Sequence, residues 1–513
     1  MSMVRKMAAK RKYIFGVAIV FISVLIIIST IWGNKTFPVI SFDQVVFHLK
    51  VPMEGTDAGI LWHWIFWCIP ISLIVTAILI ISIMVLAICF DKVYSWIKKR
   101  KLTSYCLTQQ VTEKCHCLSI VFLICSLVFV FINYSVYGYF TSIMQKTSVY
   151  ESHYVDPRSV NISFPDKKRN LIHIYLESIE NTFLSAASGG AFKEGYAKEL
   201  EELANTYINF SHIDGVGGTI GGNLTIPGTG WTAAAMVAHS AGIPLTLPIN
   251  SESYGKNCPF LPGAYGIGEV LQREGYQQKL LLGSDADFGG RSNFYKQHGD
   301  YDIVDIKRLK EQGRLPEDYH VFWGFEDEKL FAFAKEEILE LAKGDAPFNM
   351  TMLTVDAHTP QGYLSESCAT PFSSQYENVI ACQSSQVYQF VNWIQQQDFY
   401  EDTTVVITGD HTSMANWFFE NIESDFIRTT YNVVINSPIE PKKEKNRLFA
   451  AMDWYPTILA AMGAEIEGDR LGLGTNLFSE IPTLKEKKGL EYLTEELQKT
   501  SDFYNNYILK KGD

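Results

Sequence analysis

The chain has 513 residues, of which 47% are hydrophobic and 19% are charged, and its formal net charge is −12. This composition excludes a disordered protein, because a chain this rich in apolar residues can bury a large core. The acidic balance and the lack of a long basic stripe also argue against a nucleic acid partner, since neutralising phosphates requires clustered Lys and Arg.

The N-terminal part contains three long apolar segments, residues 13–32, 61–90 and 117–140, and none of them holds Asp, Glu, Lys or Arg. Each is long enough to cross the hydrocarbon core of a bilayer. The sequence therefore predicts a membrane domain over residues 1–140 with three transmembrane helices. A cleaved signal peptide over residues 1–33 is the competing interpretation, but no small-x-small cleavage site follows the first apolar run.

Basic residues predict the orientation of these helices. Two clusters of Lys and Arg flank the predicted spans, whereas residues 34–60 hold only Lys35 and Lys50. Because short basic loops stay in the cytoplasm, we expect the N-terminus and the loop between the second and third helices inside, and everything after Phe140 outside. The two clusters are Arg5, Lys6, Lys10, Arg11 and Lys12, and then Lys92, Lys98, Lys99, Arg100, Lys101 and Lys114.

Cysteine placement agrees with this topology. Only Cys258, Cys368 and Cys382 of the nine cysteines lie in the part expected outside. Cys368 and Cys382 could close a short loop as a disulfide in an oxidising compartment, with Cys258 left over, although spacing alone does not decide the pairing.

The rest of the chain predicts an α/β fold. Residues 141–166 have little periodicity, which is typical of a linker, and from residue 167 apolar strand-like runs alternate with helical patterns. This alternation predicts a sandwich with a mainly parallel central sheet over residues 167–482, followed by a helical tail over 483–513. The expected strands are 171–176, 279–282, 348–355, 404–408 and 431–435, and the expected helices lie near 193–205, 264–274, 326–343, 378–397 and 453–462.

Polar residues follow three of these strands, and open α/β sheets bind ligands outside the carboxyl ends of their strands. One such residue is commonly explained by loop capping, but three strand ends together predict a metal site. Mixed carboxylate and imidazole ligands suit manganese or zinc better than magnesium. The residues are Glu177, Asp356, His358, Asp410 and His411.

Thr232 is the candidate nucleophile. It follows a Pro-Gly-Thr-Gly turn at residues 227–230 and precedes an Ala-rich stretch, so we expect it near a helix N-terminus that favours anions. A capping threonine without chemistry is the alternative, and a neighbouring metal would favour the nucleophile because a hydroxyl needs a lowered pKa. The glycines of residues 215–222 lack the Lys-Ser/Thr of a phosphate-binding loop, which argues against a nucleotide site.

These motifs carry a resemblance to a known family. From about residue 168 to 480 the chain resembles the phosphoglycerol transferase and lipoteichoic acid synthase family, membrane-anchored members of the alkaline phosphatase and sulfatase superfamily, and especially the enzymes that act on periplasmic glucans. The resemblance implies a sulfatase-like fold and a phosphoglycerol transferase. The stretches that carry it are Ile174–Ser178, Pro227–Thr232, Ala241–Leu245, Trp323–Asp327, Thr354–His358 and Gly409–His411.

The resemblance also assigns roles to single residues. Thr232 would be both a metal ligand and the nucleophile, and His358 would contact the phosphoryl group or protonate a leaving oxygen. The metal would be one divalent ion, manganese in the first place, with magnesium or zinc as alternatives. The implied metal ligands are Glu177, Thr232, Asp410 and His411.

Arg291, in the stretch Phe288-Gly-Gly-Arg291, would grip the substrate phosphate according to the same resemblance. A solvent-facing loop arginine is the alternative for this residue. The chain departs from the family at Gly289, where the synthases have a tryptophan near this arginine, so we expect a different glycerol pocket.

The implied reaction moves phosphoglycerol from phosphatidylglycerol to a cell-envelope glycan or glycerol-phosphate polymer through a covalent intermediate on Thr232, with release of diacylglycerol. The implied location is the inner (cytoplasmic) membrane of a bacterial cell, with the catalytic domain extracytoplasmic. A phosphoethanolamine transferase of the same superfamily and a non-catalytic membrane-anchored envelope protein are the alternatives. A sulfatase proper would need a C/S-x-P-x-R nucleophile motif, which the stretch around Thr232 lacks.

Overall fold

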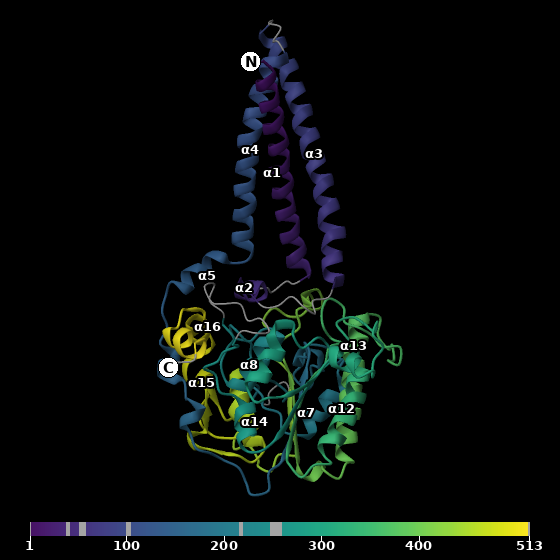
Figure 1. Cartoon of the computed structure of the whole chain (residues 1–513), viewed down its shortest axis with the longest axis vertical. Helices are drawn as coiled ribbons and strands as arrows, with labels where there is room; N and C mark the ends of the chain where they lie inside the picture. The colour runs from purple at the N-terminus through teal and green to yellow at the C-terminus, as the bar shows by residue number, and fades with distance from the viewer. Residues whose placement is uncertain are drawn as a thin grey trace. The chain divides into compact units, whose positions relative to one another are not determined.

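The structure is a computed structural model in which the chain divides into two compact units (Figure 1). The first unit comprises Met1–Phe42 and Asp57–Phe140, and the second comprises Asp43–Thr56 and Thr141–Asp513. Three of the basic loop residues (Lys99, Arg100 and Lys101), the glycines at 215, 217 and 218, and Cys258 lie outside the described residues. The structure describes residues 2–36, 42–50, 58–98, 104–214, 219–246 and 259–510.

The first unit consists mainly of three long helices, which run side by side in Figure 1. Stretches of 26, 26 and 18 residues within them are apolar enough to cross a membrane, which confirms the prediction of three apolar N-terminal helices. The first helix packs against both of the others. The helices are α1 (Ser2–Thr36), α3 (Ala58–Lys98) and α4 (Ser104–Asn133), and the shorter α5 (Val136–Ile143) follows.

The second unit is built on a six-stranded sheet with the strand order β4-β3-β5-β2-β6-β7. All neighbours are parallel except β6 and β7, so the prediction of a mainly parallel central sheet is confirmed. The three-residue edge strand β4 was not predicted. The strands are β2 (Asn170–Leu176), β3 (Gln277–Leu282), β4 (Asp302–Val304), β5 (Phe348–Leu353), β6 (Thr403–Gly409) and β7 (Asn432–Ile435).

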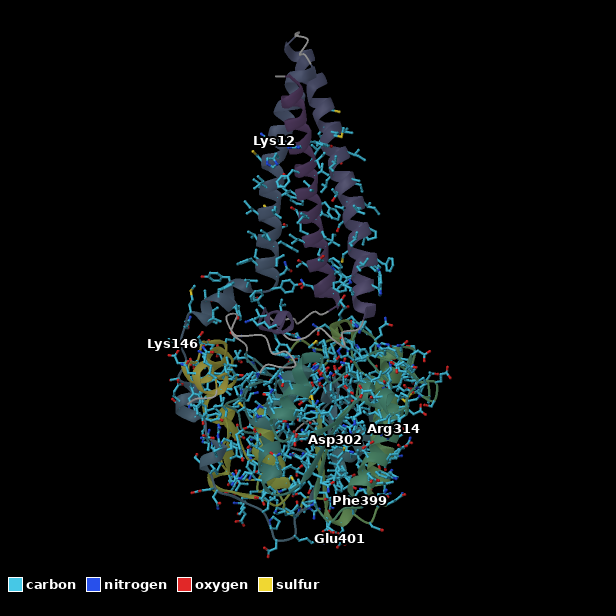
Figure 2. All side chains as sticks on the ribbon, in the orientation of Figure 1. Lys12, Lys146, Asp302, Arg314, Phe399 and Glu401 are labelled. Atoms are coloured by element: carbon cyan, nitrogen blue, oxygen red, sulfur yellow. A yellow bond between two sulfur atoms is a disulfide. The ribbon has the colours of Figure 1, made fainter. Side chains whose placement is uncertain are left out.

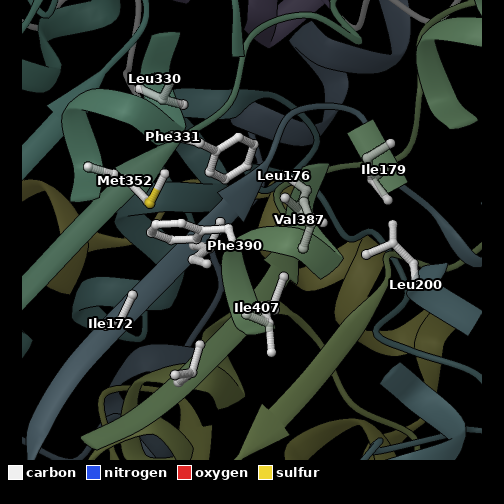
Figure 3. Close-up of a cluster of buried hydrophobic side chains, with 14 of the residues drawn as sticks. Ile172, Leu176, Ile179, Leu200, Leu330, Phe331, Met352, Val387, Phe390 and Ile407 are labelled. Carbon is white, nitrogen blue, oxygen red and sulfur yellow. The ribbon is translucent and has the colours of Figure 1, made fainter. Parts of the chain in front are cut away.

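Helices cover both faces of this sheet, and the central strands are therefore buried except at the first residue of β2. On one face, Ile172, Met352 and Ile407 pack with Phe331 and Phe390 in a buried cluster (Figure 3). The helices of this layer are α7 (Lys198–Thr206), α12 (Asp327–Leu341) and α13 (Gln375–Gln395). The remaining main helices are α8 (Thr232–Ala241), α9 (Ile267–Arg273), α10 (Arg291–Gln297), α11 (Ile306–Glu311) and α14 (Trp454–Ala461).

Charged side chains close the β4 edge of the sheet. Lys279 on β3 forms ion pairs with Asp302 on β4 and with Glu337 on α12, and Arg314 binds the same Glu337. The side chains of Asp302 and Arg314, both labelled in Figure 2, are 41% and 26% exposed. A short, charged edge strand is a common protection against pairing with another chain.

Segments before and after the central sheet in sequence complete the second unit. The stretch expected to be a linker contains α6 (Val149–His153) and β1 (Ile162–Ser163), and β1 pairs with β8 (Glu465–Ile466). The C-terminal tail forms α15 (Leu484–Lys488) and α16 (Leu490–Gln498), which bury Leu484 and Leu493. A disulfide joins Cys368, in the loop between β5 and α13, to Cys382 within α13.

Residues of α2 (Phe42–Lys50) also belong to the second unit from Asp43 onward, although they lie between the first two long helices in sequence. Phe47 is only 1% exposed, and its ring lies 5.5 Å from the ring of Trp231, the residue before α8. A segment of the chain that precedes the second long helix therefore contributes to the packing beside Thr232.

Candidate active site

The carboxyl ends of the central strands bring the candidate residues together. Glu177 directly follows β2, Asp410 and His411 directly follow β6, and His358 lies in the loop after β5. Because β2 is parallel to both β5 and β6, all three strands end at the same edge of the sheet. Thr232 reaches this edge as the first residue of α8, as the turn followed by alanines predicts.

Glu177, Asp410 and His411 form a buried cluster in which one ligand atom from each lies within 4.8 Å of the others. The hydroxyl of Thr232 donates to Oε2 of Glu177 at 3.1 Å and lies 3.4 Å from Nε2 of His411. Oδ2 of Asp410 is buried and has no hydrogen-bond partner among the residues that the structure describes. A buried carboxylate oxygen without a partner is costly, so this oxygen and its neighbours fit a divalent cation held by oxygen and nitrogen ligands.

The electrostatics of the cluster support the same interpretation. Burial, followed by repulsion from Glu177, raises the pKa of Asp410 to about 7. Burial acts on Glu177 in the same direction, but the neighbouring His358 and His411 bring its pKa below the usual value. Two carboxylates this close repel each other, and a bound cation is the ordinary means of offsetting such repulsion in proteins.

Backbone hydrogen bonds hold the ligands in place. Oδ1 of Asp410 accepts hydrogen bonds from the main-chain N–H groups of Ser178 and His411 at 2.8 and 2.7 Å. Ser178 also donates from its hydroxyl to Oε1 of Glu177 at 2.7 Å, and it adopts a φ of +58°, which is rare for a residue other than glycine. The turn after β2 thus keeps a strained backbone that connects two of the three cluster residues.

His358 is partly exposed and oriented by two contacts. Its Nδ1 lies 2.9 Å from the carbonyl oxygen of Thr359, a geometry that keeps the proton on Nδ1 and leaves Nε2 as an acceptor. The ring of Trp323 packs against the imidazole with a centroid distance of 4.3 Å. Burial lowers the pKa of His358, and the charge of Glu177 opposes that shift. A neutral imidazole with one free acceptor can move a proton to and from oxygen atoms at this edge.

Arg291 is 5% exposed, so the alternative of a solvent-facing loop arginine is wrong. Its guanidinium donates to the carbonyl oxygens of Phe288 and Asp285 and to the hydroxyl of Ser284, at 3.0, 2.7 and 3.0 Å. Burial lowers its pKa, and the charge of Glu177 is the largest of the effects that oppose this. The loop carbonyls thus hold the buried guanidinium of Arg291 close enough to interact electrostatically with Glu177.

The backbone and the packing at Gly289, two residues before Arg291, favour glycine. Its φ is +67°, a conformation that favours glycine, and a Cβ atom there would lie 3.3 Å from Cβ of Ala233 on α8. A large side chain at this position would therefore strain the loop and press on the helix that begins at Thr232.

The sequence did not assign roles to several buried residues that support the site. Asp327, at the start of α12, accepts hydrogen bonds from the main-chain N–H groups of Val355 and Asp356 and from the amide of Gln383. The same amide donates to the hydroxyl of Thr354, which also accepts the N–H of Glu177. Asp327 and Thr354 lie in motifs of the family resemblance, which was the only signal for them.

A buried ion pair also stabilises the loop that carries His411. Arg428 binds both carboxylate oxygens of Glu180, which is fully buried, and donates to the carbonyl oxygen of Ser413 at 2.6 Å. Glu180 and Arg428 are 248 residues apart in the chain, so no local pattern could have connected them.

Comparisons with known proteins agree with this geometry. The model of the Sulfatase family matches residues 169–464. Two curated proteins named phosphoglycerol transferase I are similar to the chain: the one from Shigella flexneri is 29% identical over 338 residues, and the one from Escherichia coli strain 55989 is 28% identical over 337 residues. Each alignment covers 64% of this chain but only 41% of the relative. The chain thus spans about two fifths of the length of these relatives.

A solved structure shows the same fold. The crystal structure of a protein in the alkaline phosphatase superfamily from Vibrio parahaemolyticus superposes with a TM-score of 0.50 and 21% sequence identity. The match covers 66% of this chain and 78% of that chain. The central sheet and its covering helices therefore have the same fold as that protein.

Proposed function

Because the chain belongs to the Sulfatase family, we propose that it is a membrane-anchored phosphotransferase whose active site is the cluster around Thr232. The proposed reaction moves phosphoglycerol from phosphatidylglycerol to a hydroxyl group of a cell-envelope glycan or glycerol-phosphate polymer and releases diacylglycerol. Similarity to the phosphoglycerol transferases supports the transferred group. The catalytic part would be residues 167–482, on the outer side of the cytoplasmic membrane of a bacterial cell.

The observation that carries the proposal is the position of the Thr232 hydroxyl. It lies at the N-terminus of a ten-residue helix, within hydrogen-bond distance of Glu177 and close to His411. The helix N-terminus favours the negative charge of a phosphoryl group, and Glu177 orients the hydroxyl that attacks it. A capping threonine without chemistry would not need buried carboxylate and imidazole groups beside it.

Glu177, Thr232, Asp410 and His411 would hold one divalent cation, manganese in the first place, which would polarise the phosphoryl oxygen and lower the pKa of the Thr232 hydroxyl. In the first step, the Thr232 hydroxyl loses its proton to solvent, its oxygen attacks phosphorus, and the bond from phosphorus to the diacylglycerol oxygen breaks. His358, which enters this step protonated on both ring nitrogens, gives its Nε2 proton to that leaving oxygen.

In the second step, an acceptor hydroxyl attacks phosphorus and its proton passes to His358, while the bond to Thr232 breaks and restores the threonine. Arg291 would bind a non-bridging phosphoryl oxygen in both steps, because a buried guanidinium offers fixed donors to phosphate. Positioning of the phosphoryl group is the main contribution of these side chains.

Two features support a location outside the cytoplasm. Basic residues are concentrated at the N-terminus and in the loop between the second and third long helices, as expected for cytoplasmic segments. The disulfide between Cys368 and Cys382 is of a kind that persists in oxidising compartments.

The proposal is tested by mass spectrometry of the full chain in detergent after exposure to phosphatidylglycerol or, separately, to phosphatidylethanolamine. We expect a phosphoglycerol adduct on the peptide that contains Thr232, and no adduct in Thr232→Ala, which removes the attacking oxygen but keeps helix propensity. Thr232→Ser is the matched control and should keep part of the adduct. An adduct from phosphatidylethanolamine alone would identify a phosphoethanolamine transferase, and no adduct from either lipid in a metal-loaded chain would contradict catalysis at Thr232.

A further inference from the structure

Trp417 is an exposed aromatic residue held beside the loop that carries His358. It lies in the short helix η5 (Asn416–Phe419), and 41% of its surface is exposed. Its indole N–H donates to the carbonyl oxygen of Pro360 at 3.2 Å, two residues after His358. The hydrogen bond fixes the indole to this loop and leaves much of the ring open to solvent.

Tyr376 links Trp417 to the other side of the site. The two rings lie 5.8 Å apart, and Tyr376 is fully buried beneath the tryptophan. The tyrosine hydroxyl is hydrogen-bonded to Oγ of Ser413 at 2.6 Å and donates to the carbonyl oxygen of Ala357 at 3.3 Å. Ala357 precedes His358 and Ser413 follows His411 by two positions, so Trp417 rests on both loops that carry histidines of the site.

Two further aromatic residues lie along the loop of His358. Phe322 and Tyr363 are partly exposed and stack with an interplanar angle of 21° and a centroid distance of 6.4 Å. The ring of Phe322 also lies 6.3 Å from the imidazole of His358. We call Phe322, Tyr363 and Trp417 the aromatic rim, because each contacts or belongs to the stretch from His358 to Tyr363.

Acidic residues lie close in sequence to the aromatic rim. Residues 412–427 hold the exposed carboxylates Glu420, Glu423 and Asp425 and contain no Lys or Arg. Beside Tyr363, burial and then Glu326, Asp356 and Glu366 raise the pKa of the phenol, and the charge of Lys329 opposes this shift. The exposed carboxylates disfavour a polyanionic polymer, whereas they accept hydrogen bonds readily from neutral hydroxyl groups.

We propose that the aromatic rim binds neutral sugar rings of the acceptor, with Trp417 as a specificity-determining residue. The inference rests on the proposed function and selects between its two acceptors: a neutral glycan fits, and a glycerol-phosphate polymer does not. Aromatic faces carry partial negative charge and attract the C–H groups of a sugar ring, while the neighbouring carboxylates bind its hydroxyls. A sugar hydroxyl then attacks phosphorus of the Thr232 phosphoester, the Thr232–phosphorus bond breaks, and the proton passes to His358.

The test uses the full chain in detergent with phosphatidylglycerol labelled in its glycerol head group. The acceptor is either a mixture of neutral glucose oligosaccharides or an oligo-glycerol phosphate, and both diacylglycerol release and label transfer are measured. We expect transfer to the oligosaccharides in preference. Trp417→Ala should raise the KM for oligosaccharide about tenfold, equivalent to about 1.4 kcal/mol, with a much smaller change in kcat.

Two variants separate sugar binding from a structural role. Trp417→Phe loses the hydrogen bond to Pro360 but keeps an aromatic face, so it should restore most of the oligosaccharide affinity. Ile427→Ala changes another exposed side chain of the same acidic segment, 53% exposed, and should leave the KM for oligosaccharide unchanged. Isothermal titration of the oligosaccharide mixture into the wild-type chain and Trp417→Ala reports binding without turnover and should show the same loss.

Three results would overturn the inference. The first is an equal loss of diacylglycerol release and transfer in Trp417→Ala with normal oligosaccharide binding. The second is a preference of the wild-type chain for the oligo-glycerol phosphate, and the third is reduced binding of Trp417→Ala to phosphatidylglycerol vesicles with unchanged oligosaccharide affinity. Absence of diacylglycerol release by the wild-type chain would instead contradict the proposed function, and the titration would still decide whether the rim binds sugar.

Discussion

Asp327→Asn should reduce turnover without touching any residue proposed to react. Asp327 is fully buried, and its two carboxylate oxygens accept three hydrogen bonds: from the N–H of Val355 at 2.7 Å, the N–H of Asp356 at 3.3 Å and the amide of Gln383 at 2.8 Å. Two of these donors belong to the main chain three and two residues before His358. The carboxylate therefore determines the course of the loop that positions the imidazole.

The size of the effect follows from counting donors and acceptors. Asparagine keeps one acceptor, which Val355 would use, and turns an NH₂ group toward Asp356 and Gln383. Gln383 can rotate its amide, because its own buried Oε1 has no hydrogen-bond partner in the described part of the chain, but it then loses the bond that it donates to Thr354. About one buried donor stays unpaired, which costs about 1–3 kcal/mol of unfolding free energy. A shift of His358 by about 1 Å would lower kcat by up to about 100-fold.

The assay compares Asp327→Asn with Glu328→Gln, the matched change at the next residue. Glu328 is exposed and bonds only to the side chain of Ser367 among the contacts of the described residues, so its variant should behave like the wild-type chain. Thermal unfolding and turnover of phosphatidylglycerol are measured on both. Wild-type kcat in Asp327→Asn, at whatever stability, would refute the argument that this carboxylate positions His358.

Three other predictions concern metal, pH and topology. Glu177→Ala and Asp410→Ala should each lose bound metal and activity while remaining folded, measured by elemental analysis and thermal unfolding, and full metal occupancy in both would place the metal elsewhere. Burial lowers the pKa of Lys485 to about 7, well below the usual 10.5 of a lysine. Between these two values the unfolded state binds more protons than the folded state, so this group makes stability rise with pH across that window. Lys485→Met should therefore stabilise the chain by about 1–3 kcal/mol, most strongly below pH 7, whereas the exposed Lys487→Met should not; an unchanged pH profile of the melting temperature would contradict this. A reporter fused after Asp513 should be active only outside the cytoplasm, and activity inside would reverse the topology.

Much of the second unit could be predicted because its central strands are apolar throughout. Five predicted strands coincide with β2, β3, β5, β6 and β7 within about two residues, since strands buried on both faces stand out from helical patterns. Strand β4 was missed because three residues show no period. The packing of Phe47 was missed because the short helix α2 lies between two apolar segments that dominate the local pattern.

The residues of the site likewise fall into those that the sequence predicts and those that it does not. Glu177, Asp410 and His411 could be found because they directly follow strands that share one edge of the sheet. The hydrogen bonds of Asp327 and the contact between Trp417 and Pro360 depend on loops that only the tertiary fold brings together. No periodicity or spacing in the chain encodes such contacts, so residues of this kind need coordinates.

The place of Phe47 in the second unit has a consequence for the order of synthesis. This side chain leaves the ribosome before the second and third long helices, whereas its partner Trp231 follows them. Phe47 therefore cannot pack against Trp231, beside Thr232, until the three long helices have been synthesised. A fragment that begins at residue 141 would lack the segment around Phe47 that belongs to the second unit. Adding Asp43–Lys50 as a separate peptide is the direct way to restore it.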